Sequence, residues 1–347
     1  MKTVSAPRIA ITMGDPCGVG PEILVKALSG REPDVRRSAL VVGDPLALER
    51  AATLLRRPLK VHVVEKPGDL QVPRPDGGLT LFAPCRLSER DIQYGSPTGE
   101  ACRAAVQYIQ WAARLAIEGA VDAMCTCPIN KANLQRHGFP FPGHTEFLQE
   151  LTGTDHVVMM LAGPRLRVAL ATIHEALAEV PGLLSKELLA RCISITGEAL
   201  MRDLGIRKPR IAVAGLNPHA GEEGRFGREE IQLIRPVVET FKGLPYHVSG
   251  PYAPDTVFHR AYQGEFDAVV SMYHDQGLIP IKLVHFQEAV NITLGLPLVR
   301  TSVDHGTAYD LAGTGNADEG SLVAAIRLAV QVVHNRRASG QAGMPTP

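Results

Sequence analysis

Three histidines stand just beyond the ends of three apolar runs of strand length, at His174, His219 and His274. Neutral imidazoles that converge on one point form a ligand set for Zn²⁺ or a similar divalent ion, with positions left open for a substrate. Their spacings of 45 and 55 residues (219 − 174 and 274 − 219) match no local zinc motif. The prediction of a metal site therefore depends on a fold that brings the three strand ends together. Taken one at a time, each histidine is more simply a hydrogen-bonded loop residue.

A second pattern would suit an anion. Lys282, Asn291 and Arg300 are nine residues apart, across two apolar segments that we expect to be extended, Ile279–Val284 and Val290–Val299. Two cations and an amide near a metal would bind a phosphate and a carboxylate. Solvated charges on separate strands are the alternative interpretation.

The elements that carry these residues follow a regular pattern. Short apolar runs alternate with longer helical patterns, which predicts an α/β protein with mostly parallel strands. The expected strands are Arg8–Met13, Ala39–Val42, Lys60–Val64, Val121–Thr126, Leu166–Thr172, Arg210–Gly215 and Asp267–Tyr273. The expected helices are one that starts at Ser96 and stops at Gly119, then Ser185–Leu204, Arg228–Phe241 and Ser321–Val333. If the strands before the three histidines are parallel neighbours, the imidazoles emerge at the carboxyl edge of one sheet, where open α/β sheets bind ligands.

Other strand ends carry polar loops. The loop Gly14–Glu22 has its glycines at positions 14, 18 and 20, so it is not the G-x-G-x-x-G dinucleotide fingerprint. Pro128–Lys131 places an amide and an ammonium group after another strand, and His144 beside Thr145 supplies an imidazole and a hydroxyl. Each of these alone is typical of ordinary loops and helix caps.

The composition excludes several classes of protein. A length of 347 residues predicts two domains of roughly 150 residues each. Lys+Arg and Asp+Glu both number 36, so the chain has no basic excess for nucleic acid or for an anionic membrane surface. No apolar stretch approaches the roughly 20 residues that span a bilayer, and Met1–Ile11 has no signal-peptide core. We expect a cytoplasmic protein.

Six cysteines are scattered along the chain, which is not the disulfide framework of a small secreted domain. Cys125 and Cys127 are separated by one residue rather than two, and no second pair completes a zinc site. We expect both to be small buried thiols.

Together the loops make this sequence resemble the 4-hydroxythreonine-4-phosphate dehydrogenase family of pyridoxal phosphate biosynthesis. The resemblance runs from about Ile9 to Val333, nearly the whole chain. It rests on several motifs in the same order, Gly14–Pro16, Gly18–Glu22, Pro128–Lys131, Gly143–Glu146, Asn217–Glu222, Tyr273–Gly277 and Val290–Pro297.

A broader resemblance covers Asp304–Ala317, which is similar to the nucleotide loop of isocitrate and isopropylmalate dehydrogenases. That superfamily binds NAD(P) without a Rossmann fingerprint. The resemblance implies two α/β/α domains, each with a mostly parallel sheet, an interdomain cleft, and a homodimer whose active site takes residues from both subunits. We expect a first domain of residues 1–130 with 290–347, including the nucleotide loop, and a second of residues 131–289 with the metal ligands and dimer contacts.

The family resemblance also implies residue roles. The metal ligands would be His174, His219 and His274, with zinc preferred over magnesium, manganese or cobalt. The substrate would contact His144, Thr145, Lys282, Asn291 and Arg300. The loop residues expected to hold NAD, with NADP as the alternative, are His305, Gly306, Asp310, Gly313 and Asn316. Asp255 and Asp275 are candidates either to orient a ligand histidine or to act as the base.

The implied reaction oxidises the C3 hydroxyl of 4-phosphohydroxy-L-threonine, with hydride transfer to the nicotinamide. The resulting 3-oxo acid would decarboxylate to 3-amino-2-oxopropyl phosphate. However, Leu278–Phe286 and Thr172–Leu177 look more like relatives that oxidise D-threonate or D-erythronate 4-phosphate in sugar-acid breakdown. A branch that handles an aromatic cis-dihydrodiol fits the motifs less well.

A non-catalytic metabolite-binding scaffold is a rival of another class, but such a scaffold should have lost some ligand histidines or the nucleotide loop. A phosphate-transfer enzyme would not need three histidines at strand ends.

Overall fold

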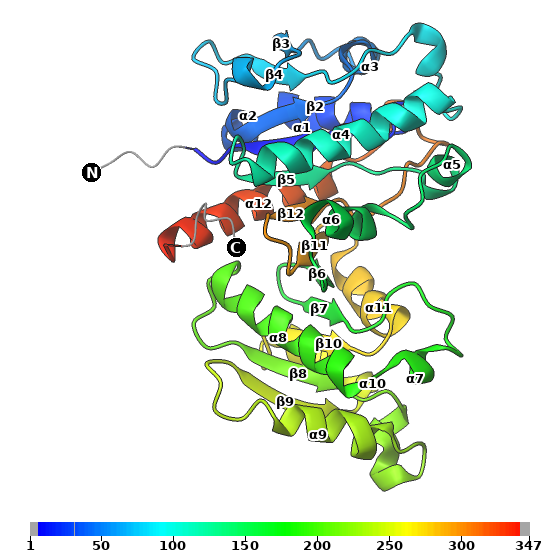
Figure 1. Ribbon diagram of the computed structural model, residues 1–347, viewed down its shortest axis with the longest axis vertical. Helices are drawn as coiled ribbons and strands as arrows, with labels where there is room; N and C mark the ends of the chain where they lie inside the picture. The colour runs from blue at the N-terminus through cyan, green and yellow to red at the C-terminus, as the bar shows by residue number, and fades with distance from the viewer. Residues whose placement is uncertain (1–5, 31, 341–347) are drawn as a thin grey trace. The chain divides into compact units, whose positions relative to one another are not determined.

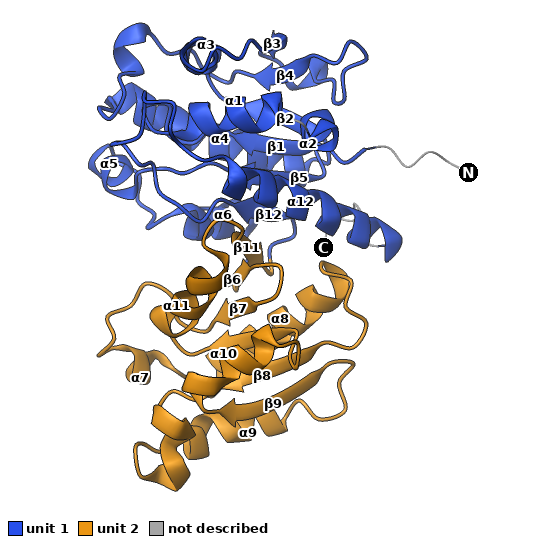
Figure 2. Ribbon diagram, turned by 180° about the vertical axis from the view of Figure 1, so that it is seen from behind, with its two compact units in different colours: residues 1–154, 296–347 blue, residues 155–295 orange. Residues whose placement is uncertain are grey.

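Strands of three to six residues alternate with helices along the described chain, which confirms the predicted mostly parallel α/β class. The computed structural model describes residues 6–30 and 32–340. The chain divides into two compact units, Met1–Thr154 with Leu296–Pro347 (unit 1) and Asp155–Gly295 (unit 2), which Figure 2 colours separately. Compared with the boundaries expected from the sequence, unit 1 also takes in residues 131–154. Helix α6 (His144–Thr152) lies in this stretch and packs against α4 (Gly99–Ile117) of the same unit.

Unit 1 contains a parallel sheet in the order β3-β4-β2-β1-β5-β12. Its strands are β1 (Ile9–Thr12), β2 (Ala39–Val42), β3 (Val61–Val64), β4 (Leu79–Phe82), β5 (Ala123–Thr126) and β12 (Arg300–Ser302). Its other helices are α1 (Gly20–Ser29), α2 (Pro33–Ser38), α3 (Pro45–Leu54), α5 (Lys131–Arg136) and α12 (Gly320–Ala338). Strands β1, β2, β4 and β5 are buried along their whole length, as in a parallel sheet covered on both faces.

The register of this sheet brings three loops to one edge. Thr12 pairs with Thr126, and Thr126 pairs with Ser302, so β1, β5 and β12 end level with one another. Figure 1 shows β5 and β12 side by side, and Figure 2 also labels β1 next to β5. The segments that follow them, residues 13–19, 127–130 and 303–319, therefore all leave from the carboxyl edge of the sheet, where α/β proteins bind ligands.

Helix α4 begins slightly later than the sequence predicts. Its N-cap is Thr98, whose hydroxyl accepts the Ala101 N–H at 3.2 Å, rather than Ser96. Helix α12, by contrast, starts one residue earlier and ends five residues later than expected from Ser321–Val333, at Gly320 and Ala338.

Unit 2 contains a mixed sheet in the order β11-β6-β7-β10-β8-β9. Its strands are β6 (Val158–Ala162), β7 (Arg167–Leu170), β8 (Arg210–Ala214), β9 (His247–Tyr252), β10 (Ala268–Ser271) and β11 (Val290–Leu294). Its helices are α7 (Val180–Leu183), α8 (Lys186–Arg202), α9 (Arg235–Glu239), α10 (Pro254–Tyr262) and α11 (His274–His285). Strand β6 is antiparallel to both of its neighbours, and the pairs β7–β10, β10–β8 and β8–β9 are parallel.

One predicted element is wrong. Ile279–Val284, expected to be extended, is the second half of helix α11. Leu278 and Ile281 are buried in a hydrophobic core with residues of β7 and β10, while Leu283 on the outer face is 84% exposed. Both the buried and the exposed face of this part of the helix are apolar, so the sequence does not show the usual helical alternation of apolar and polar residues. A short apolar run without that alternation resembles a strand.

Both cysteines of the Cys125–Cys127 pair are fully buried and free, as predicted. Burial raises the pKa of the Cys125 thiol to about 12, so it remains protonated at neutral pH. Across the described residues, no helix is both long and apolar enough to cross a membrane.

Candidate functional site

The carboxyl edge of the unit 2 sheet carries the three histidines. Strand β10 lies between β7 and β8 and is parallel to both, so the predicted arrangement of the preceding strands is confirmed. His174 and His274 lie close together, with ring centroids 5.4 Å apart and planes inclined by 40°. Two imidazoles bound to one tetrahedral ion would have ring centres about 5 Å apart, given metal–nitrogen distances of about 2.0–2.1 Å. This pair is therefore spaced as two ligands of one ion would be.

A neighbouring carboxylate orients one ring of the pair. His274 is the first residue of α11, and its Nδ1 lies 2.7 Å from Oδ1 of Asp275. When a carboxylate accepts a hydrogen bond from Nδ1–H, the ring is held in the tautomer whose Nε2 has a lone pair for a metal. Asp275 thus lies where the first of its two predicted roles requires. Asp255, the other candidate, is exposed in the first turn of α10.

His219 does not join the pair. It begins a run of five residues, 219–223, that all have positive φ, between 42° and 80°. This left-handed backbone is unfavourable for residues other than glycine, and it turns the exposed His219 ring toward Phe226, at 6.2 Å. Glu230 holds the start of the loop, since its buried carboxylate accepts the Asn217 N–H at 2.8 Å.

Within residues 6–30 and 32–340 no three His, Cys, Asp or Glu side chains lie close enough together to hold one metal ion. The pair His174 and His274 fits a metal in its spacing, whereas the full three-histidine set stays a prediction.

Two of the predicted substrate residues, Lys282 and Asn291, lie in unit 2. Lys282 is half-buried on α11, and Asn291 on β11 has a buried side-chain oxygen with no hydrogen-bond partner among the described residues.

Unit 1 contains a buried cationic site. Arg300 of β12 is only 3% exposed, and its Nη2 donates to the Thr126 hydroxyl at 2.8 Å. Burial lowers the pKa of Arg300 from 12.5 to about 10, and the nearby Cys125 and Glu146 act in the opposite direction. Because the buried guanidinium has lost the water that would stabilise its charge, it gains free energy when it pairs with an incoming anion.

His144 belongs to the same site. It is the first residue of α6, it is buried, and its Nε2 has no hydrogen-bond partner in the described part of the chain. Its pKa lies well below 6.5 because of burial, then because of the positive charges of Arg300 and Lys131. His144 is therefore neutral at physiological pH and can donate a hydrogen bond from one ring nitrogen. Thr145, the next residue, is half-buried.

The predicted nucleotide loop follows β12 at the carboxyl edge of the unit 1 sheet. Among the residues expected to hold the cofactor, His305, Gly306, Asp310 and Asn316 are exposed and Gly313 is half-buried. Next to Asp310, Tyr309 turns inward, and its hydroxyl donates to Oδ2 of the buried Asp15 at 2.5 Å. The loop thus exposes the expected residues while its other side chains fix it to the rest of unit 1.

Residues 36–329 match the protein family described as pyridoxal phosphate biosynthetic protein PdxA. The chain belongs to the PdxA family. It is 50% identical over 334 residues to the 4-hydroxythreonine-4-phosphate dehydrogenase of Trichlorobacter lovleyi, covering 95% of this chain and 98% of that protein. It is 44% identical over 331 residues to the D-threonate 4-phosphate dehydrogenase of Cupriavidus necator, covering 95% and 98% of the two chains. The crystal structure of a 4-hydroxythreonine-4-phosphate dehydrogenase from Klebsiella pneumoniae superposes with a TM-score of 0.85 at 39% identity, over 95% of this chain and 99% of that one.

Two residues of this PdxA-family chain join the unit 1 site although neither was among the predicted substrate residues. Lys131, at the start of α5, contributes to the low pKa of His144. Thr126, the last residue of β5, accepts the hydrogen bond from Arg300. The position of Lys131 after a buried strand was a signal in the sequence, whereas the contact of Thr126 depends on the pairing of β5 with β12.

Proposed function

We propose that this PdxA-family chain is a nicotinamide-dependent 4-hydroxythreonine-4-phosphate dehydrogenase. It would oxidise the C3 hydroxyl of 4-phosphohydroxy-L-threonine to a 3-oxo acid, which decarboxylates to 3-amino-2-oxopropyl phosphate. The observation that carries the proposal is the 50% identity to the Trichlorobacter lovleyi enzyme across nearly the full length of both chains. The buried cationic site of unit 1 and the histidine pair of unit 2 support it independently.

The unit 1 site supports recognition of an anionic substrate. Arg300 would donate charge-assisted hydrogen bonds to a phosphate or carboxylate oxygen, and His144 would donate a neutral one. Thr145 would add a hydroxyl beside them. In unit 2, Lys282 supplies an ammonium group and Asn291 a buried amide oxygen that lacks a partner in the described residues. These five residues are those proposed to contact substrate.

We further propose that His174 and His274 bind a divalent ion, with His219 as a third ligand. Imidazole ligands suit zinc best, and magnesium, manganese or cobalt are the alternatives. When bound, such an ion lowers the pKa of a coordinated hydroxyl and polarises a carbonyl. The hydrogen bond between Asp275 and His274 supports an orienting role for Asp275, which leaves Asp255 as the candidate base.

The loop of residues 305–317 is proposed to hold the adenosine part of NAD, with NADP as the alternative. Its proposed contacts are His305, Gly306, Asp310, Gly313 and Asn316. A bound nicotinamide accepts the hydride from C3. The inward anchoring of Tyr309 supports this assignment, since a fixed loop can present its exposed groups to a ligand with little further ordering.

A homodimer is the proposed assembly. Ile279, Leu283 and Phe286 follow one another at intervals of four and three along α11 and its C-cap, so they lie on one face, and they are 66%, 84% and 76% exposed. A contiguous apolar face of this kind on a water-exposed surface is typical of a protein–protein contact. We propose that a second copy of the chain covers it.

An alternative substrate is D-threonate 4-phosphate, favoured by the 44% identity to the Cupriavidus necator enzyme. The two substrates differ at C2, where only the amino acid carries an amine. NADH formation should therefore be followed with metal-supplemented protein and, separately, 4-phosphohydroxy-L-threonine, D-threonate 4-phosphate and D-erythronate 4-phosphate. We expect the highest kcat/KM with the amino acid. A preference for either sugar acid would replace the proposed substrate, and no NADH from any of the three would reject the proposed activity.

A further inference from the structure

The carboxylate of Glu22 is fully buried in α1 and binds the backbone of the distant 305–317 loop. Its Oε1 accepts the Gly313 N–H at 2.5 Å, and its Oε2 accepts the Gly315 N–H at 2.9 Å. Both oxygens of a buried charge are therefore used on one short stretch of loop. Hydrogen bonds to a carboxylate are about twice as strong as neutral ones, so this contact is a strong constraint on the shape of the loop.

The loop adopts a backbone shape that suits this carboxylate. Gly313 and Gly315 have φ values of +82° and +73°, a conformation that favours glycine. Successive N–H groups in such turns form a concavity that binds an anion, which here is the side chain of Glu22. A Cβ atom on Gly313 would lie 2.4 Å from Cδ2 of Tyr94, so the glycine is enclosed between the Glu22 carboxylate and an aromatic ring.

Two more contacts fix the ends of the same loop. Lys26, one turn after Glu22 on α1, donates to the Ala317 carbonyl at 2.5 Å. At the other end, Tyr309 donates to Asp15, at 2.5 Å. The 305–317 loop is thus held near its start, middle and end by residues 15–26.

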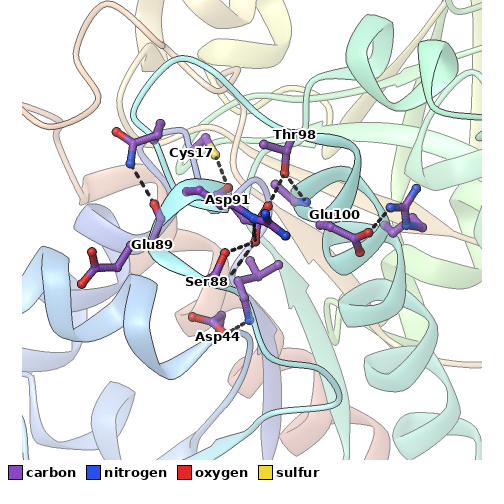
Figure 3. A network of polar contacts seen from close by, with 12 residues as sticks. Cys17, Asp44, Ser88, Glu89, Asp91, Thr98 and Glu100 are labelled. Atoms are coloured by element: carbon purple, nitrogen blue, oxygen red, sulfur yellow. Dashed lines mark hydrogen bonds and ion pairs between the residues drawn. The ribbon is translucent and has the colours of Figure 1, made fainter.

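The Tyr94 ring is itself held in place. The Arg50 guanidinium lies 4.2 Å from the centre of the ring. Three residues earlier in the chain, Asp91 binds Ser88 and Thr98 (Figure 3). The Asp91 carboxylate accepts hydrogen bonds from the Thr98 hydroxyl at 3.0 Å and from the Ser88 N–H at 3.2 Å. Tyr94 therefore packs against Gly313 as part of a segment that has its own hydrogen bonds.

We infer that Glu22 is a positioning residue that holds the 305–317 loop in its binding shape and thereby sets the affinity for the nicotinamide nucleotide. The inference rests on the proposed role of that loop. A loop that is already ordered loses less conformational entropy when a ligand binds, so weakening its anchor should weaken nucleotide binding specifically. Neither the chemical step nor recognition of the phosphorylated substrate should depend on Glu22.

The test is Glu22→Gln, which keeps the shape of the side chain but retains only one acceptor and presents an NH₂ group to the second N–H. Glu49→Gln makes the same chemical change on the exposed side of α3 and serves as the matched control. NAD⁺ binding is measured by calorimetry without substrate, and steady-state kinetics follow. We expect about a tenfold higher Kd and KM for NAD⁺, equivalent to about 1.4 kcal/mol. We expect kcat at saturating NAD⁺ and the KM for the phosphorylated substrate to be unchanged in both variants.

Amide hydrogen exchange separates failure of the inference from failure of the loop assignment. Faster exchange in residues 305–317 of Glu22→Gln, together with weaker NAD⁺ binding, supports the inference. Faster exchange with unchanged NAD⁺ affinity would overturn both the inference and the nucleotide role of the loop. Unchanged exchange and affinity would overturn the inference alone. If Glu22→Gln does not fold, Lys26→Met removes a different anchor of the loop, and wild-type NAD⁺ affinity in that variant would reject the inference.

Discussion

Arg300 provides a quantitative prediction because its charge is buried in the absence of substrate. Burial lowers the pKa of its guanidinium from 12.5 to about 10. Each pKa unit corresponds to about 1.4 kcal/mol, so the charged form is destabilised in the folded chain by about 3 kcal/mol relative to water. Because the folded-state pKa is the lower one, this cost is fully present below pH 10 and therefore at neutral pH.

Replacement of Arg300 by methionine removes that cost and keeps an unbranched side chain of similar length. The variant also loses the hydrogen bond from the charged guanidinium to the Thr126 hydroxyl, which contributes about 1.5 kcal/mol. The free energy of unfolding should therefore rise by about 1–2 kcal/mol. For a unit of roughly 200 residues, this corresponds to a Tm higher by about 2–8 °C. The same change should abolish anion binding, a trade of function for stability that is common at binding sites.

The assay is thermal unfolding in a buffer free of phosphate and other multivalent anions, followed by titration with inorganic phosphate. Wild-type protein should gain Tm as phosphate is added, whereas Arg300→Met should begin higher and not respond. Arg57→Met, at an exposed position whose contact to Ser29 is 3.5 Å long, is the matched control and should behave as wild type. A lower Tm of Arg300→Met in anion-free buffer would refute the argument, because it would mean that the buried charge stabilises the free protein.

Three other predictions follow from single contacts. Because the pKa of His144 is held well below 6.5, the unfolded chain takes up a proton that the folded chain does not as pH falls below about 6.5. His144→Gln should thus lose less Tm than wild type between pH 7.5 and 5, and equal losses would contradict this. Burial raises the pKa of Asp15, and the hydrogen bond from Tyr309 opposes that rise. Tyr309→Phe should therefore cost about 2 kcal/mol in urea unfolding at pH 7, and less as the pH is lowered and Asp15 takes up a proton. An unchanged midpoint at pH 7 would refute this. Leu283→Arg places a charge on the exposed apolar face of α11 and should convert a dimer to a folded monomer in sedimentation. A persistent dimer would remove this face from the interface.

The sequence predicts strand ends well and side-chain directions poorly. Parallel pairing of β10 with β7 and β8 follows from the α/β pattern, and it brings His174 within reach of His274. The position of His219 depends on a run of left-handed backbone in residues 219–223, of which only Gly221 is a glycine. No local pattern encodes such a turn, because most of its residues disfavour it individually.

Helix α11 and Glu22 show two other limits. The outer face of α11 carries Ile279 and Leu283, so both faces are apolar and the helical period is hidden. Glu22 is visible in the sequence as part of a polar loop motif, but its partner Gly313 is 291 residues away. The level ends of β1, β5 and β12 and the packing of α1 against α12 bring the two segments together.

The central claim is that the chain transfers hydride from C3 of a phosphorylated hydroxy acid to a nicotinamide and that carbon dioxide then leaves. The most direct test uses 4-phosphohydroxy-L-threonine with deuterium at C3, NAD⁺ and metal-supplemented protein, with mass analysis of the cofactor and capture of carbon dioxide. The proposed function predicts one deuterium in each reduced cofactor, one carbon dioxide per substrate consumed, and a primary isotope effect when hydride transfer limits the rate. Reduced cofactor without deuterium, or substrate turnover without reduced cofactor, would contradict it.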